Sequence, residues 1–194
     1  GRANPIDMTM VVELREAIRE AKITPEVKGL ILTGQKNFFS AGLDVIELYG
    51  YDEEQMIDFW QEFAALIAEL AYCPKPVIAA ITGHSPAGGC VLALCCDQRV
   101  MAEGTYKIGL NEIPVGIVVP APIYHLYAYN LGQRQAHQYL LEGRLFTPEE
   151  ALEIGMIDVI VPADQVLSEA QKRLNTYLAF DAHTWKTSKR NLRA

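Results

Sequence analysis

The residues best suited to chemistry lie in the segment 83–91, which reads Gly-His-Ser-Pro-Ala-Gly-Gly-Cys-Val. An apolar run at 77–81 precedes it and a second apolar run at 91–96 follows it. The first run is typical of a buried strand and the second of a buried helix, so we expect a tight glycine turn between them. Such a turn leaves backbone N–H groups unpaired at a helix N-terminus, where they can stabilise a developing negative charge. The segment is therefore a candidate for half of an oxyanion hole.

Two other interpretations of this turn, a serine-hydrolase elbow and a nucleotide-binding loop, are disfavoured by its residues. Ser85 approximates the G-x-S-x-G elbow of serine hydrolases, but there the residue after the serine donates its N–H to the oxyanion. Pro86 has no N–H to donate, and Ala87 replaces the last glycine of that pattern. A nucleotide-binding loop is also disfavoured, because the segment has neither a Gly-Lys-Ser/Thr ending nor a G-x-G-x-x-G pattern. We therefore favour an oxyanion hole.

A second turn of the same kind lies at 38–47, which reads Phe-Phe-Ser-Ala-Gly-Leu-Asp-Val-Ile-Glu. It follows the apolar run 30–32, just as the first turn follows an apolar run of its own. Asp44 and Glu47 have the spacing of a capping box at the start of a helix, so their expected role is structural. We interpret this turn as the partner of the first one.

Hydrophobic periodicity predicts the elements that position the two turns. Apolar residues spaced three or four apart indicate helices near 11–21, 56–70, 121–130, 133–142, 148–154 and 163–179. Short apolar runs indicate strands at 30–32, 77–81, 99–102 and 157–161. Strands that alternate with helices favour an α/β architecture with mainly parallel strands.

Composition restricts the class of protein further. The chain has 194 residues, 50% of them hydrophobic, which is typical of one domain with a buried core. The formal net charge is −7, and no basic block or zinc-finger spacing occurs, so we expect no nucleic-acid partner. No apolar run approaches the roughly 20 residues that span a bilayer, so we expect no membrane span.

The cysteines are expected to be buried small hydrophobic residues rather than a disulfide or metal set. Cys90, Cys95 and Cys96 form a Cys-x₄-Cys-Cys run with only His84 nearby, which fits no common zinc pattern. The other histidines show no metal-ligand spacing, so we expect no bound metal. Unpaired cysteines favour a reducing compartment.

Together, the turns at 38–47 and 83–91 resemble the crotonase (enoyl-CoA hydratase/isomerase) superfamily. The resemblance continues in the same order through 96–102, 108–117, 141–144, 148–155 and 159–162. It implies an α/β fold with a crotonase-like ββα spiral core at residues 1–180. It also implies that the first strands and most of the C-terminal helical region are lacking, with 181–194 as the truncated start of that region.

The resemblance also implies which groups do the chemistry. In this superfamily two backbone N–H groups hold the thioester oxygen, and by motif these are the amides of Leu43 and Gly88. Hydratases use two glutamates, one directly after the Gly-Gly-Cys turn and one at the position matched by Glu112. Val91 occupies the first of these positions and can neither orient water nor transfer a proton. From its spacing alone Glu112 would be an exposed turn carboxylate, but the motif makes it the expected sole acid/base.

A single carboxylate suits isomerisation of 3-enoyl-CoA to 2-enoyl-CoA, and the motifs look most like the mitochondrial-type Δ3,Δ2-enoyl-CoA isomerases. By the same resemblance the acyl pocket is lined by Trp60, Phe63, Ile117 and Val118, with Tyr49, Tyr51 and Val119 as further candidates. The helical spacing of Trp60 and Phe63 fits core packing equally well. His84 is expected to be a structural, backbone-bonded residue, and Asp97 to cap or bond backbone.

The resemblance further implies an acyl-CoA substrate, no metal or redox cofactor, and a homotrimer or hexamer. The expected compartment is the cytoplasm in a bacterium or the mitochondrial matrix in a eukaryote. Two alternatives stay open. The chain could catalyse another one-glutamate reaction of this superfamily, such as hydrolysis or decarboxylation of an acyl-CoA, or it could bind acyl-CoA without catalysis.

Overall fold

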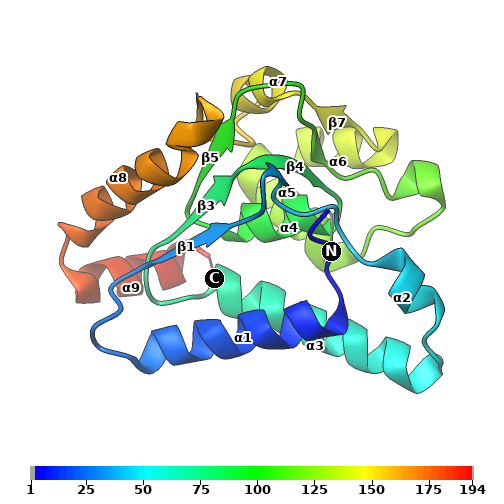
Figure 1. Cartoon of the computed structure of the whole chain (residues 1–194), viewed down its shortest axis with the longest axis horizontal. Coiled ribbons are helices and arrows are strands. Elements are labelled where there is room, and N and C mark those ends of the chain that lie inside the picture. The colour runs from blue at the N-terminus through cyan, green and yellow to red at the C-terminus, as the bar shows by residue number, and fades with distance from the viewer. Residues whose placement is uncertain (1–2, 194) are drawn as a thin grey trace.

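The computed structural model describes residues 3–193, whose strands form two four-stranded sheets (Figure 1). The first sheet is parallel throughout and consists, in spatial order, of β1 (Leu30–Thr33), β3 (Val77–Ile81), β5 (Gln98–Ala102) and β8 (Val159–Val161). The second consists of β2 (Asn37–Phe38), β4 (Gly83–Pro86), β6 (Ile108–Gly109) and β7 (Leu145–Phe146), with only the last pair antiparallel.

Strands β1 to β6 enter the two sheets alternately, and a helix follows each pair. The first pair, β1 and β2, leads to α2 (Val45–Tyr49) and α3 (Glu53–Ala71). The second pair, β3 and β4, leads to α4 (Gly88–Cys95), and β5 and β6 lead to α5 (Ala121–Leu131). This repeated strand–strand–helix order is the ββα spiral that the sequence predicts.

The first sheet is covered on both faces, which explains its apolar strands. Along β3, Val77, Ala79 and Ile81 belong to the main core, whereas Ile78 and Ala80 belong to a second cluster on the opposite face. That second cluster is closed by Val166, Ala170 and Leu174, which are spaced four apart along α8 (Val166–Leu178). Figure 1 shows α8 on one side of the sheet and α1 (Met8–Ile23) with α3 on the other.

The remaining helices are α6 (Gln133–Glu142), α7 (Pro148–Glu153) and α9 (Ala182–Leu192). Side-chain caps fix several helix starts: Asp7 caps α1, and reciprocal capping boxes join Asp52 to Gln55 and Thr147 to Glu150. The predicted strands and helices are all present; β3 and α6 have the predicted ends, and the others have shifted ends. One predicted helix, 163–179, is divided into a 3₁₀ turn, Ala163–Gln165, and α8.

The prediction of one tight turn between residues 77–81 and 91–96 was wrong. The chain instead forms a further strand, β4, and α4 begins at Gly88, before the apolar run that predicted it. The reversal between them occurs at Ala87, which has a φ of +50°. Most of the second sheet was not predicted, because its two-residue strands show no alternation of apolar and polar residues.

A buried ionic cluster joins α9 to the first sheet. Lys189 Nζ lies 2.7 Å from Asp97 Oδ2, and Arg193 Nη2 lies 3.2 Å from Asp97 Oδ1. Asp97 Oδ2 also accepts a hydrogen bond of 2.8 Å from the Val77 amide, which confirms the predicted bond to backbone. Arg193 donates to the Cys95 carbonyl as well, at 2.7 Å. One carboxylate therefore connects α9, β3 and the end of α4.

All four cysteines are buried and unpaired, as the sequence predicts. Across residues 3–193, no helix has the length and apolar character needed to traverse a bilayer.

Replacing the central carboxylate should destabilise the fold strongly. Asp97→Ala leaves the ammonium of Lys189 buried without its counter-charge, which typically costs about 3–5 kcal/mol of the free energy of unfolding. Urea titration followed by circular dichroism measures this loss. The control, Lys172→Ala, breaks an exposed pair with Glu169 and should change little. Equal midpoints for both variants would contradict the structural role of Asp97.

Candidate active site

One cavity of about 220 Å³ brings together every residue to which the sequence assigned a principal role at the site. Its lining includes Leu43, Trp60, Phe63, Gly88, Glu112, Ile117 and Val118. These residues come from the two turns, from α3 and from the loop after β6. The cavity therefore lies where three consecutive strand–strand–helix units meet.

The two turns are in direct contact at the cavity. A methyl group built on Gly42 would lie 2.8 Å from the Ala87 Cβ and 3.2 Å from the Gly88 nitrogen. Gly42 also has a φ of +89°, a conformation that favours glycine. A side chain at position 42 would thus push the turns apart, so glycine is needed to bring Leu43 and Gly88 to the same cavity.

The backbone around Leu43 is held on both sides. The Ile6 amide donates to the Gly42 carbonyl at 2.8 Å, and the Asp44 amide donates to the Ile6 carbonyl at 2.9 Å. The Leu43 amide lies between these bonds and donates to no acceptor among the described residues. Gly88 is the first residue of α4, where no side-chain cap is present, and its amide is unpaired in the same sense. Two unpaired N–H groups at one cavity are what an oxyanion hole requires.

The turn before α4 depends on an uncommon backbone conformation. A φ of +50° is unfavourable for alanine and costs roughly 1–3 kcal/mol unless the surroundings enforce it. Here the Ala87 amide donates to the Gly109 carbonyl at 2.8 Å, across the junction of β4 and β6. This bond ties the turn before α4 to the strand that leads to Glu112.

Glu112 lies at the start of a short 3₁₀ turn, Ile113–Val115. Its carbonyl accepts hydrogen bonds from the Val115 amide at 3.1 Å and the Ile117 amide at 2.9 Å, which fix its backbone. The side chain lines the cavity, and its Oε2 is buried without a hydrogen-bond partner among the described residues. Burial raises the pKa of this carboxyl above its usual range, although its own backbone amide opposes the shift. A carboxyl group in this environment is suited to accept and return a proton.

The remaining walls of the cavity are mainly apolar. Val91, where the resemblance places a glutamate in hydratases, is buried and lines the cavity. The rings of Trp60 and Phe63 meet edge to face, with centroids 6.1 Å apart. The structure therefore places these two aromatic residues both in the packing of α3 and at the cavity. Within residues 3–193 no group of His, Cys, Asp and Glu side chains is arranged to hold a metal ion.

Three of the further pocket candidates lie elsewhere. Tyr49 is 95% exposed on α2, and Tyr51 donates a hydrogen bond to Glu47. Neither lines the cavity, and Val119 lines a neighbouring one instead. The resemblance places both tyrosines near the pocket. Instead, Tyr49 points outward from α2, and a hydrogen bond to Glu47 holds Tyr51.

Of the two structural roles predicted near the turns, that of His84 is confirmed and the capping box of Asp44 and Glu47 is confirmed only in part. His84 Nδ1 accepts a hydrogen bond from the Lys107 amide at 3.1 Å, which confirms its structural role. Asp44 caps α2 by accepting from the amides of Ile46 and Glu47, each at 3.1 Å. The expected capping box is only half formed, because the Glu47 carboxylate accepts from Tyr51.

Several lining residues, notably Asn111 and Ile123, were not predicted from the sequence. Asn111 precedes Glu112 directly and could have been found from that adjacency. Ile123 gave no such signal, because it resembles any other core residue of α5. It packs in the main core and is also exposed to the cavity.

With this geometry in view, comparison with known proteins identifies the family. A family model described as enoyl-CoA hydratase/isomerase matches residues 1–194. The chain belongs to this family, within the crotonase superfamily. The mouse protein named enoyl-CoA delta isomerase 1, mitochondrial, is 38% identical over 98% of this chain. The chain spans 66% of that relative's length.

Solved structures of the family share the fold. The crystal structure of human mitochondrial delta3-delta2-enoyl-CoA isomerase has a TM-score of 0.95 and is 33% identical, covering 98% of this chain and 75% of that one. An enoyl-CoA hydratase from Bacillus anthracis has a TM-score of 0.90 at 26% identity, covering 97% and 73%. Relatives of both names therefore share this architecture, and the residues at the cavity must distinguish the reactions.

The environment of Glu112 predicts a pH-dependent effect on stability. Because its pKa is raised on folding, the folded chain binds this proton more tightly than the unfolded chain. Ionised Glu112 therefore lowers the free energy of unfolding as the pH rises through the raised pKa. Glu112→Gln removes that loss, so its melting temperature should match the wild type below about pH 4. The difference should grow as the pH rises to the raised pKa of Glu112 and stay constant above it.

Thermal unfolding followed by circular dichroism at a series of pH values measures this difference. The control is Glu26→Gln, which changes an exposed loop glutamate and should give parallel curves. A constant offset for Glu112→Gln across the pH range would show that its carboxyl is not desolvated.

Proposed function

We propose that this protein isomerises 3-enoyl-CoA thioesters to 2-enoyl-CoA thioesters, with Glu112 as the sole acid/base. One observation carries the proposal. Among the described residues, Glu112 is the single carboxylate that lines the cavity, and two backbone amides beside it are unpaired. The apolar Val91 stands where hydration would need a second carboxylate. The likeness to enoyl-CoA isomerases of mouse and human supports it.

The reaction follows from the groups present. The Glu112 carboxylate takes the α-proton from C2 of the substrate, and the electron pair of that C–H bond moves into the thioester carbonyl. The Leu43 and Gly88 amides stabilise the negative charge on the carbonyl oxygen of the resulting dienolate. The protonated Glu112 then returns the proton to C4, and the double bond moves to C2–C3. Each step uses only this carboxyl and backbone amides, so the proposal calls for no metal or redox cofactor.

The raised pKa of Glu112 fits both halves of this cycle. A carboxylate in an apolar cavity is a stronger base than one in water, because desolvation disfavours its charged form. Its affinity for the α-proton is therefore increased. The same neutral carboxylic acid is then held beside C4 without water to take the proton away. The apolar walls thus favour transfer within the substrate over exchange with solvent.

Removing the acid/base should abolish most of the activity. Glu112→Gln keeps the size of the side chain but cannot accept the α-proton, so we expect kcat to fall by about 10²- to 10⁴-fold with little change in KM. The increase in conjugated-enoyl absorbance from 3-enoyl-CoA measures turnover. Glu26→Gln, the exposed loop variant, is the matched control and should retain full activity.

The same assay separates the competing functions. Turnover of another acyl-CoA without conjugated product would favour a hydrolase or decarboxylase built on the same residues. Binding of acyl-CoA with no turnover of any kind would identify a non-catalytic binding protein. Unchanged activity in Glu112→Gln would remove this residue from the reaction.

Separating the two turns should affect the oxyanion hole without touching Glu112. Gly42→Ala places a methyl group 2.8 Å from the Ala87 Cβ and strains a φ of +89°, so the Leu43 and Gly88 amides can no longer converge. Loss of one oxyanion donor typically lowers kcat by about 10²- to 10³-fold.

The matched control is Gly50→Ala, at the end of α2. There the new methyl group would lie 3.3 Å from the Glu47 carbonyl, with a negative φ. Gly50→Ala should retain kcat, and circular dichroism should show that both variants are folded. A folded Gly42→Ala protein with full kcat would contradict the assigned oxyanion hole.

A further inference from the structure

The position of Glu112 relative to the turn at Gly88 depends on how β4 pairs with β6. Strand β4 leads directly to Gly88, and β6 leads to Glu112. The two strands pair over only two residues each, beginning with Ser85 opposite Ile108. Because a shift of about 1 Å at a catalytic group can cost roughly 10²-fold in rate, this short pairing needs further restraint.

The side chain of His84 supplies an additional bond between these strands. The Ser85 amide donates to the Lys107 carbonyl at 2.8 Å. The Lys107 amide donates in turn to Nδ1 of the His84 ring, at 3.1 Å. Pro86, the next residue of β4, has no amide N–H to contribute. Two neighbouring residues of β4 therefore hold both backbone polar groups of Lys107, one through its amide and the other through its ring.

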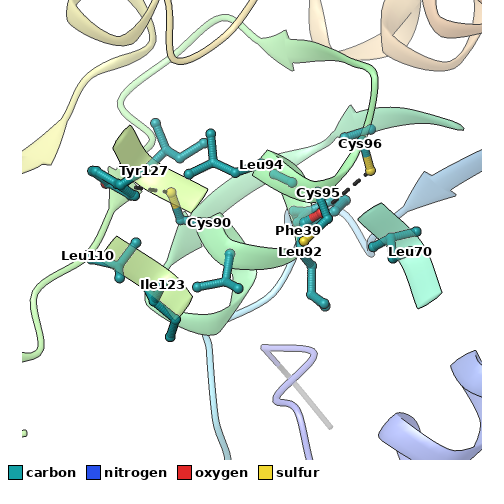
Figure 2. Packing of buried hydrophobic residues seen from close by; sticks show 14 of the residues in the cluster. Phe39, Leu70, Cys90, Leu92, Leu94, Cys95, Cys96, Leu110, Ile123 and Tyr127 are labelled. Atoms are coloured by element: carbon teal, nitrogen blue, oxygen red, sulfur yellow. Dashed lines mark hydrogen bonds between the residues drawn. The ribbon is translucent and has the colours of Figure 1, made fainter. Parts of the chain in front are cut away.

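Burial restrains the chain after β6 more than the chain before it. Leu110, directly after β6, is 1% exposed and lies in the main core with Cys90 and Ile123 (Figure 2). Before β6, residues 103–105 are exposed and Lys107 is half-buried. The bond to the His84 ring is therefore placed where packing restrains the strand less.

The His84 ring is itself held between two elements. Phe38 of β2 pairs with His84 and lies against its ring, with centroids 5.2 Å apart. Tyr106 meets the same ring edge to face, with centroids 5.3 Å apart. The Tyr106 hydroxyl donates to Asn37 Oδ1 at 3.0 Å, which fixes this contact. The acceptor for the Lys107 amide is thus oriented by its surroundings.

The backbone of His84 also bonds the first turn. Its carbonyl accepts hydrogen bonds from the Phe39 amide at 2.9 Å and the Ser40 amide at 3.3 Å. Both amides belong to the segment that leads to Leu43. One residue therefore joins all three strand–strand–helix units that form the cavity.

We propose that His84 is a positioning residue for Glu112, a role that rests on the function proposed above. Its ring holds the strand before Glu112 in register with the two oxyanion turns. The bond requires an unprotonated Nδ1, because a protonated Nδ1 would point a second N–H at the Lys107 amide. Among the described residues, Tyr106 and Lys107 are the titratable residues that meet the ring, and β2 contributes the uncharged Phe38. Protonation of the ring should therefore release the strand and lower kcat.

Two substitutions separate the acceptor from the charge. His84→Leu removes the acceptor, so we expect kcat for 3-enoyl-CoA to fall by about 10- to 100-fold while KM stays within about twofold. His84→Asn places an amide oxygen near the position of Nδ1 and does not titrate, so it should keep kcat within about threefold of the wild type at about pH 8. The matched control, His183→Asn, changes an exposed histidine of α9 and should leave kcat unchanged.

The pH profile gives a readout that a purely structural role would not change. Histidine side chains ordinarily change charge between about pH 5 and about pH 8. Titration of Glu112 is common to the wild type and His84→Asn, so it cancels in the ratio of their kcat values. The ratio of wild type to His84→Asn should therefore fall as the pH is lowered from about 8 to about 5. A ratio that does not change with pH would overturn the proposal, as would wild-type kcat in folded His84→Leu.

Hydrogen exchange tests the bond without turnover. In His84→Leu the Lys107 amide loses its acceptor, so peptides covering 105–110 should exchange faster while peptides from α8 do not change. If the wild type fails to isomerise 3-enoyl-CoA, the proposed function fails, yet this measurement still decides whether His84 holds the strand. Unchanged exchange at 105–110 in the folded variant would overturn that role. If His84→Leu does not fold, the comparison of wild type with His84→Asn across pH decides in its place, by the kcat ratio or by exchange of the same peptides.

Discussion

The site depends on the close contact of two backbone turns. Gly42 touches Ala87 and Gly88 so closely that a methyl group at position 42 would lie 2.8 Å from another carbon. Backbone amides, unlike side chains, cannot rotate toward a ligand, so they converge only if the whole turns converge. The strand order, the bridge from Ile6 to Leu43 and the strained φ of Ala87 all serve this contact.

The environment of Glu112 follows from the same arrangement. Packing the turns against α3 and the loop after β6 gives a cavity with mainly apolar walls, and an apolar wall raises the pKa of a carboxyl. The fold therefore sacrifices some stability at neutral pH in order to keep the carboxyl that we propose as the base in this cavity. Such a local cost is common at catalytic sites, because the groups that react are not arranged for maximal stability.

The sequence predicted some parts of this molecule well for identifiable reasons. Strand β3 and helix α6 have the predicted ends, because one is a clean apolar run and the other a clean helical period flanked by glycines. The second sheet was missed, since strands of two residues cannot show a period. Nothing in the sequence indicates that Ala87 adopts a positive φ, because alanine strongly prefers other conformations.

The residues of the site also divide into those that the sequence predicts well and those that it does not. Leu43, Gly88 and Glu112 were selected by the motifs around them, and the structure brings all three to one cavity. Tyr49 was selected by position alone and points into solvent. Ile123 was not selected, because an isoleucine on an apolar helix looks like any core residue until it is seen to line the cavity. Motif residues were thus easier to predict than the residues that complete the cavity.

The alternation of strands between two sheets has a consequence for how such a site can change over time. Each strand–strand–helix unit contributes one component: the first brings Leu43, the second Gly88 and Val91, and the third Glu112. The components are therefore modular. A substitution at position 91 could add an ionisable side chain to the cavity without moving the backbone amides of Leu43 and Gly88. One scaffold can in this way change its chemistry by single substitutions, one unit at a time, without rebuilding the contact between the two turns.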